Sequence, residues 1–132
     1  MKNTEKFFET YCDFVTKVTS DPSLKIEDLK KSLDEIQDNS PIDTPRLLTA
    51  ALGLGSETGE FVEIVKKMIL QGKPADQDNI FHMKRELGDV MWYCAALAAD
   101  LGFDLDRIAN ENLEKLSARM TENKIKGSGD KR

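Results

Sequence analysis

The sequence predicts an all-α protein of four main helices and one short extra helix. Apolar residues recur every three or four positions over four long stretches, as expected when one face of a helix is buried. Residues that start and stop helices flank these stretches. No run alternates apolar and polar residues between turn signals, as a half-buried strand would.

The first predicted helix starts near Asn3 or Thr4 and ends at Ser20-Asp21-Pro22. We expect its aromatic stripe to be core, the alternative being that one member lines a base pocket; the stripe comprises Phe7, Phe8, Tyr11 and Phe14. A short amphipathic helix is predicted over residues 24–36, with apolar residues on one side and a solvated charged face on the other.

Residues typical of helix starts and ends mark the other three predicted helices. Thr44-Pro45 is a start signal for a helix that should run to about Leu70, since proline suits the first helical position. Asp76-Gln77-Asp78-Asn79 offers caps for the next helix, which Gly102 should close. Asp104 can cap the last helix.

Length and charge bound the class of protein. The chain has 132 residues, 39% of them hydrophobic and 33% charged, which is typical of a soluble globular domain. We expect one domain over residues 1–122 and a polar, mobile tail over 123–132. A net charge of −5 argues against binding a nucleic acid polymer. No stretch reads as a signal peptide or membrane span, so we expect the protein to be cytoplasmic and not bound to a membrane.

The third main helix, predicted between Asp76 and Gly102, has an apolar side wider than one neighbouring helix would cover. This side also carries Leu87, Met91, Cys94 and Ala98. We therefore expect homo-oligomerisation, as a homodimer or a dimer of dimers, to complete the bundle. Cys12 and Cys94 lie in apolar helical contexts without metal-ligand spacing, and we expect both to be packing residues.

Two matching acidic segments organise the chain: Glu57-Thr58-Gly59-Glu60-Phe61 and Glu86-Leu87-Gly88-Asp89-Val90. Residues three apart are neighbours on a helix, so each segment presents a pair of carboxylates. Glu57 and Glu86 fall in the middle of apolar stripes and should face inward, where an uncompensated carboxylate is costly. Oxygen-only ligands favour Mg²⁺, with Mn²⁺ as a substitute, held by Glu57, Glu60, Glu86 and Asp89.

Two further observations refine this site. Gly53, Gly55, Gly59 and Gly88 predict close helix packing beside the metal, since glycine inside a helix costs up to about 1 kcal/mol. Di-iron helical proteins use Glu-x-x-His, whereas the single histidine, His82, lies four residues before Glu86. That spacing argues against di-iron chemistry and leaves His82 as either structural or a ligand contact.

The ordered set of segments between about Leu47 and Arg119 resembles the MazG-like all-α nucleoside triphosphate pyrophosphohydrolases, in particular their phage-type branch. Its signature region covers residues 44–120. The segments that carry the resemblance are Glu57-x-x-Glu60, the stretch Gln71-Gly72-Lys73-Pro74, Glu86-Leu87-Gly88-Asp89-Val90-Met91-Trp92-Tyr93 and Asn112-Leu113-Glu114-Lys115-Leu116.

The resemblance implies Mg²⁺-dependent hydrolysis of a nucleoside triphosphate to the monophosphate and pyrophosphate, by water attack at the α-phosphate, in the host cytoplasm if the protein is of phage origin. Glu57 or Glu60 would accept the water's proton, and the residues do not decide which. Some relatives carry an extra acid before the first glutamate, where this chain has Ser56.

Cations for the phosphates would come from the last helix. Asn112, Lys115 and Arg119 match the family's Asn-x-x-Lys-x-x-x-Arg pattern and would bind the phosphates, although a solvated basic edge looks the same in sequence. Lys67 is a weaker candidate for the same role. Tyr93 lies one turn beyond Asp89 and would border the base or simply pack.

Trp92 points away from the acids and suits a subunit contact.

Two alternative functions remain open: a catalytically idle metal-binding dimer that serves as an interaction module, and hydrolysis of phosphoribosyl-ATP.

Overall fold

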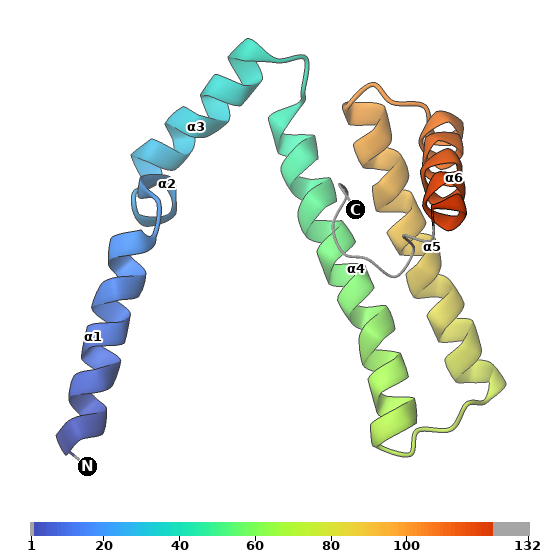
Figure 1. Ribbon diagram of the computed structural model, residues 1–132, viewed down its shortest axis with the longest axis horizontal. Helices are drawn as coiled ribbons and strands as arrows, with labels where there is room; N and C mark the ends of the chain where they lie inside the picture. The colour runs from blue at the N-terminus through green and yellow to red at the C-terminus, as the bar shows by residue number, and fades with distance from the viewer. Residues whose placement is uncertain (1, 123–132) are drawn as a thin grey trace. The chain divides into compact units, whose positions relative to one another are not determined.

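The computed structural model describes residues 2–122, and side chains from Lys6 onward. The described residues form six α-helices and no strand, so the predicted all-α class is confirmed. The helices are α1 (Lys2–Val18), α2 (Asp21–Leu24), α3 (Ile26–Asn39), α4 (Thr44–Leu70), α5 (Gln77–Asp100) and α6 (Leu105–Thr121) (Figure 1). The predicted tail over 123–132 lies outside the described residues.

The chain divides into two compact units, one ending at Thr44 and the other beginning at Pro45. The first unit holds α1, α2 and α3, and the second holds nearly all of α4 together with α5 and α6. None of the described helices is long and apolar enough to cross a bilayer.

The second unit is built on an antiparallel pair, α4 and α5, joined by the loop over residues 71–76 (Figure 1). Gly72 ends α4 with a φ of 70°, a left-handed conformation that glycine adopts without steric cost. The Lys73 N–H donates to the Lys67 carbonyl across this turn at 3.1 Å. The side chain of Asp76 accepts from the Asn79 N–H at 3.0 Å and so caps α5, as predicted.

The turn from α5 to α6 also contains the residues predicted to end one helix and to cap the next. Gly102 has a φ of 69°, and the Phe103 N–H donates to the Ala98 carbonyl at 2.8 Å. The side chain of Asp104 accepts from the Asp106 N–H and caps α6. These turns fix where α5 begins and ends, and hence which of its residues face α4.

The buried apolar core of the described residues is small and consists of Ala50, Ile64 and Ala98. Ala50 and Ile64 lie on α4, on the same stripe as Glu57, and Ala98 lies on α5. The interior of the helix pair therefore coincides with the face that carries the acidic residues.

The structure differs from the predicted start of the chain. Asp21-Pro22 begins the short helix α2 instead of only ending α1, because proline is accommodated in a first helical turn. The aromatic stripe of α1 is not core: its four rings are between 57% and 63% exposed. A single helix cannot bury its own stripe, and Phe7 and Tyr11 stack on each other instead.

The expectation that both cysteines are packing residues is wrong for the single chain, because both thiols are exposed. Cys12 lies on α1, whose described side chains are all exposed. Cys94 shares a stripe of α5 with Leu87 and Met91, which are also exposed.

Close packing explains one of the four helical glycines. A β-carbon at Gly53 would overlap the ring of Tyr93, so any side chain there would force the ring to shift. A β-carbon at Gly55, Gly59 or Gly88 would meet no atom within 4 Å, and the predicted tight packing at those positions is wrong for the single chain.

Candidate metal and nucleotide site

Three carboxylates converge between α4 and α5. Glu57 and Glu60 project from one turn of α4, and Glu86 faces them from α5. One oxygen of each lies within 4.8 Å of the others. We call these three residues the acid trio. Their three-residue spacing on α4 and the antiparallel return of α5 bring them together.

The trio spans a gradient from interior to solvent. Glu86 is 7% exposed, Glu57 is half-buried and Glu60 is exposed. Desolvation raises the pKa of Glu57 above its ordinary value of 4.5, and the charges of Glu60, Asp89 and Glu86 raise it further. A hydrogen bond with Glu86 raises the pKa of Glu57 as well.

Asp89, the fourth predicted ligand, is exposed. Its charge contributes to the raised pKa of Glu57, so the two carboxylates interact electrostatically. The converging group defined by mutual oxygen distances consists of the trio without Asp89.

His82 makes a contact that gives the histidine a place in the site. Its Nε2 lies 2.9 Å from Oε1 of Glu86, one helical turn along α5. The side chain of His82 is 50% exposed, whereas that of Glu86 is 9% exposed. The spacing of four residues was the available sequence signal, since i and i+4 side chains meet on a helix.

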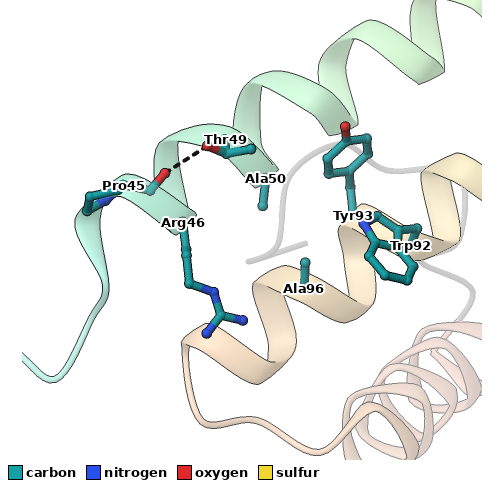
Figure 2. A pocket seen from close by; sticks show the side chains of 7 residues that line it. All are labelled: Pro45, Arg46, Thr49, Ala50, Trp92, Tyr93 and Ala96. Atoms are coloured by element: carbon teal, nitrogen blue, oxygen red, sulfur yellow. Dashed lines mark hydrogen bonds between the residues drawn. The ribbon is translucent and has the colours of Figure 1, made fainter.

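Tyr93 lies one turn beyond Asp89, and its ring covers Gly53 of α4. The ring lines a hollow of about 320 Å³ between the start of α4 and the second half of α5 (Figure 2). The hollow is lined by Pro45, Arg46, Thr49, Ala50, Trp92, Tyr93 and Ala96. Because Gly53 lies one turn before Glu57, the hollow adjoins the acid trio along α4.

The opposite end of this hollow carries a second charged group. Nε of Arg46 lies 3.9 Å from Oδ1 of Asp100, whose side chain is 3% exposed. The other carboxylate oxygen of Asp100 has no hydrogen-bond partner among the described residues. Apart from Arg46, the residues that line the hollow are apolar, aromatic or hydroxyl-bearing.

The predicted phosphate-binding residues on α6 are placed differently from one another. Asn112 and Lys115 are exposed and line another hollow of about 350 Å³ together with Ile108 and Glu111. Arg119 is buried, with 7% exposure. The predicted edge thus presents two accessible polar groups and one buried guanidinium.

Lys67, the weaker phosphate candidate, is engaged on its own helix. Its Nζ lies 3.0 Å from Oε1 of Glu63, and Lys66 lies 3.7 Å from the same oxygen. Lys67 lowers the pKa of Glu63 through a hydrogen bond and its charge, and the charge of Lys66 lowers it further. In the single chain Lys67 therefore forms a surface ion pair.

The donor chemistry of the trio fits a hard divalent cation. All the ligand atoms are carboxylate oxygens, which suit Mg²⁺ and Mn²⁺. Desolvation and the neighbouring carboxylates both raise the pKa of Glu57. A bound cation would offset the repulsion among the carboxylates.

The second unit thus combines an antiparallel helix pair, a carboxylate cluster and a partly apolar hollow. The family model of the MazG nucleotide pyrophosphohydrolase domain matches residues 46–122, more than half of the chain. The chain belongs to this family, as the sequence resemblance predicted.

A curated relative extends the comparison. The Gene 37 protein of Mycobacterium phage L5 is 45% identical over 83 residues, which cover 61% of this chain and 72% of the relative. This likeness agrees with the predicted phage-type branch of the family. No solved structure matches the chain.

Proposed function

We propose that the protein hydrolyses nucleoside triphosphates or deoxynucleoside triphosphates to the monophosphate and pyrophosphate, with Mg²⁺ as cofactor. The observation that carries the proposal is the acid trio of Glu57, Glu60 and Glu86, in a chain whose residues 46–122 match the pyrophosphohydrolase family. A polyphosphate substrate asks a protein mainly for charge neutralisation and placement of water.

The trio, together with Asp89, would hold the cation. When bound, Mg²⁺ supplies positive charge against the phosphates and lowers the pKa of a water molecule. Glu57 or Glu60 accepts the proton that the attacking water loses. The exposure of Glu60 keeps it available for the same role.

The hollow beside Tyr93 supports a place for the nucleobase. Its volume of about 320 Å³ is at the lower end of ligand pockets, which span roughly 300–1,000 Å³ and are mostly apolar. Tyr93 offers aromatic surface on which a base can stack. With the base here, the triphosphate extends along α4 towards the trio.

Asn112, Lys115 and Arg119 are proposed to bind the phosphates, with Lys67 as a secondary contact. Lys115 is exposed in a hollow and carries the charge that a phosphate needs. Lys67 would have to exchange its ion pair with Glu63 for the substrate, which costs little at an exposed site.

We further propose that a second copy of the chain covers the outer face of α5. Leu87 is 51% exposed, Met91 66% and Trp92 71%. Large apolar side chains gathered on one helix face mark an interaction surface. A homodimer or a dimer of dimers would bury them.

The proposal is tested by measuring pyrophosphate release from ordinary and modified ribonucleoside and deoxyribonucleoside triphosphates, with and without Mg²⁺. Release of pyrophosphate together with the monophosphate, dependent on Mg²⁺, is the expected result. Preference for phosphoribosyl-ATP would keep the chemistry and change the substrate. Cation binding without release from any compound would favour the idle interaction module and contradict the proposal.

A further inference from the structure

His82 and Glu86 form the most specific polar contact beside the acid trio. Nε2 of His82 lies 2.9 Å from Oε1 of Glu86, and both residues lie on the same face of α5. Glu86 is the most buried member of the trio. A buried carboxylate needs a hydrogen-bond donor, and His82 is placed to be one.

The contact leaves Glu86 with capacity to bind a cation. A carboxylate accepts about four hydrogen bonds or ligands through its two oxygens, and a single imidazole occupies one of these positions. Neither nitrogen of His82 belongs to the group of atoms that converge within 4.8 Å, whose members are all carboxylates. His82 therefore lies outside the acid trio as a hydrogen-bond donor, whereas the three carboxylates are the candidate metal ligands.

We propose that His82 is a positioning residue for the metal site. Its imidazole donates the Nε2 proton to Oε1 of Glu86 and holds that carboxylate in the orientation that faces Glu57 and Glu60. The inference rests on the proposed function, because the trio must be the metal site. His82 contacts neither substrate nor cation in this role.

The rigid spacing on α5 explains why one side chain suffices. His82 and Glu86 are four residues apart on a continuous helix, so their side chains meet without any loop to order. Donors that orient metal ligands typically affect metal affinity by roughly 10- to 100-fold. Loss of the His82 donor should weaken cation binding by an amount in that range.

Two variants separate donation from packing. His82→Leu removes the donor, whereas His82→Gln keeps an N–H group at a similar distance from the backbone. Mn²⁺ binding without nucleotide, followed by electron paramagnetic resonance, should be weaker in H82L by roughly 10- to 100-fold and close to wild type in H82Q. The Mg²⁺ concentration for half-maximal pyrophosphate release should rise in H82L, while kcat at saturating Mg²⁺ and nucleotide changes little.

The wild-type protein gives an independent measurement, because His82 is the single histidine of the chain. In protein labelled with ¹⁵N-histidine, imidazole spectra should show a proton on Nε2 both without Mg²⁺ and with Mg²⁺ bound. Loss of that proton on Mg²⁺ binding would make His82 a metal ligand and overturn the inference. This readout does not depend on whether a variant folds.

The remaining outcomes distinguish the inference from the function on which it rests. Equal Mn²⁺ binding by wild type and H82L, with pyrophosphate release intact, overturns the role of His82 alone. Weak binding by both H82L and H82Q also overturns it, since a donor would have been retained without effect. Absence of both Mn²⁺ binding and pyrophosphate release in the wild type overturns the proposed function together with the inference.

Discussion

The ring of Tyr93 on α5 occupies the space that a side chain at Gly53 on α4 would need. This contact brings the two helices together next to the acid trio and forms one wall of the hollow between them. It also explains why an otherwise unfavourable glycine lies inside a long helix.

Gly53→Ala should destabilise the protein. The added methyl must displace Tyr93, and overpacking costs roughly 1–3 kcal/mol, more than the gain of about 1 kcal/mol in helix propensity. Thermal or denaturant unfolding measures the difference. Gly55→Ala is the matched control, because a β-carbon there meets no atom within 4 Å and should stabilise by up to about 1 kcal/mol.

The double variant Gly53→Ala/Tyr93→Ala checks the cause. Without the ring, the alanine should become as favourable as it is at position 55. A loss of stability that persisted in the Tyr93→Ala background would show that the ring is not the obstacle.

Glu57→Gln should stabilise the metal-free protein near neutral pH. The pKa of Glu57 is higher in the folded than in the unfolded chain, so the folded state holds the proton more tightly. Its contribution to stability is fully present below the ordinary pKa of 4.5 and is lost as pH rises through the raised folded pKa. Unfolding curves in EDTA should therefore separate the variant from wild type above that range and merge below it.

Glu63→Gln provides a control of opposite sign for this pH dependence. The pKa of Glu63 is lowered by Lys67 and Lys66, so its contribution is present above 4.5 and is lost as pH falls through the folded pKa. The variant should be slightly less stable than wild type at neutral pH. Identical pH profiles for both variants would contradict the assignment for Glu57.

Asp89→Asn should lower Mg²⁺-dependent pyrophosphate release by roughly 100-fold or more, as should Glu60→Gln. Several kcal/mol of charge stabilisation depend on the cation, and each 1.4 kcal/mol or so is a factor of ten in rate. Asp78→Asn makes the same chemical change at an exposed position of α5 and should leave the rate unchanged. Near-normal turnover in both D89N and E60Q would remove these residues from the site.

Lys115→Ala should weaken nucleotide binding more than metal binding. A hydrogen bond to a charged group contributes about 1.5–3 kcal/mol, which corresponds to a rise in KM of roughly 10- to 100-fold. Mn²⁺ titration without nucleotide should be unaffected. Arg107→Ala is the control, because Arg107 lies on the same helix and pairs with Glu111 at 2.7 Å. Equal nucleotide titrations for K115A and wild type would argue against the phosphate role of Lys115.

Met91→Glu should reduce the molecular mass in solution. Wild type is expected to exceed the 14.9 kDa of one chain by light scattering, because the proposed partner copy would bury the outer face of α5. A charge at that face should separate the copies, whereas Met91→Leu keeps the apolar surface and the assembly. A wild-type mass of a single chain would refute the proposal.

Sequence reasoning located the helices of the second unit well because their ends depend on local chemistry. Proline after Thr44, glycine at positions 72 and 102, and aspartate caps at 76 and 104 act on their immediate neighbours. Such signals are legible without knowing what lies across the helix. The same holds for the carboxylate spacing within each acidic segment.

Contacts between different helices were harder to predict from the sequence. Nothing local distinguishes Gly53, which faces a ring, from Gly55, which faces open space. Helical periodicity reports an apolar face and cannot say what covers it, so the exposed stripe of α1 looks the same as a core stripe. The contact of His82 with Glu86 follows from spacing, but its importance depends on the burial of Glu86.

The antiparallel pairing of α4 and α5 also determines where the chain can change length. A residue inserted between Gly53 and Glu57 would rotate everything on one side of it by about 100° and turn the carboxylates away from the ring that covers the glycine. An insertion in the loop between Gly72 and Asp76 would lengthen a surface segment without rotating either helix. Within α4, α5 and the segment that joins them, length variation among functional variants should therefore be confined to that loop.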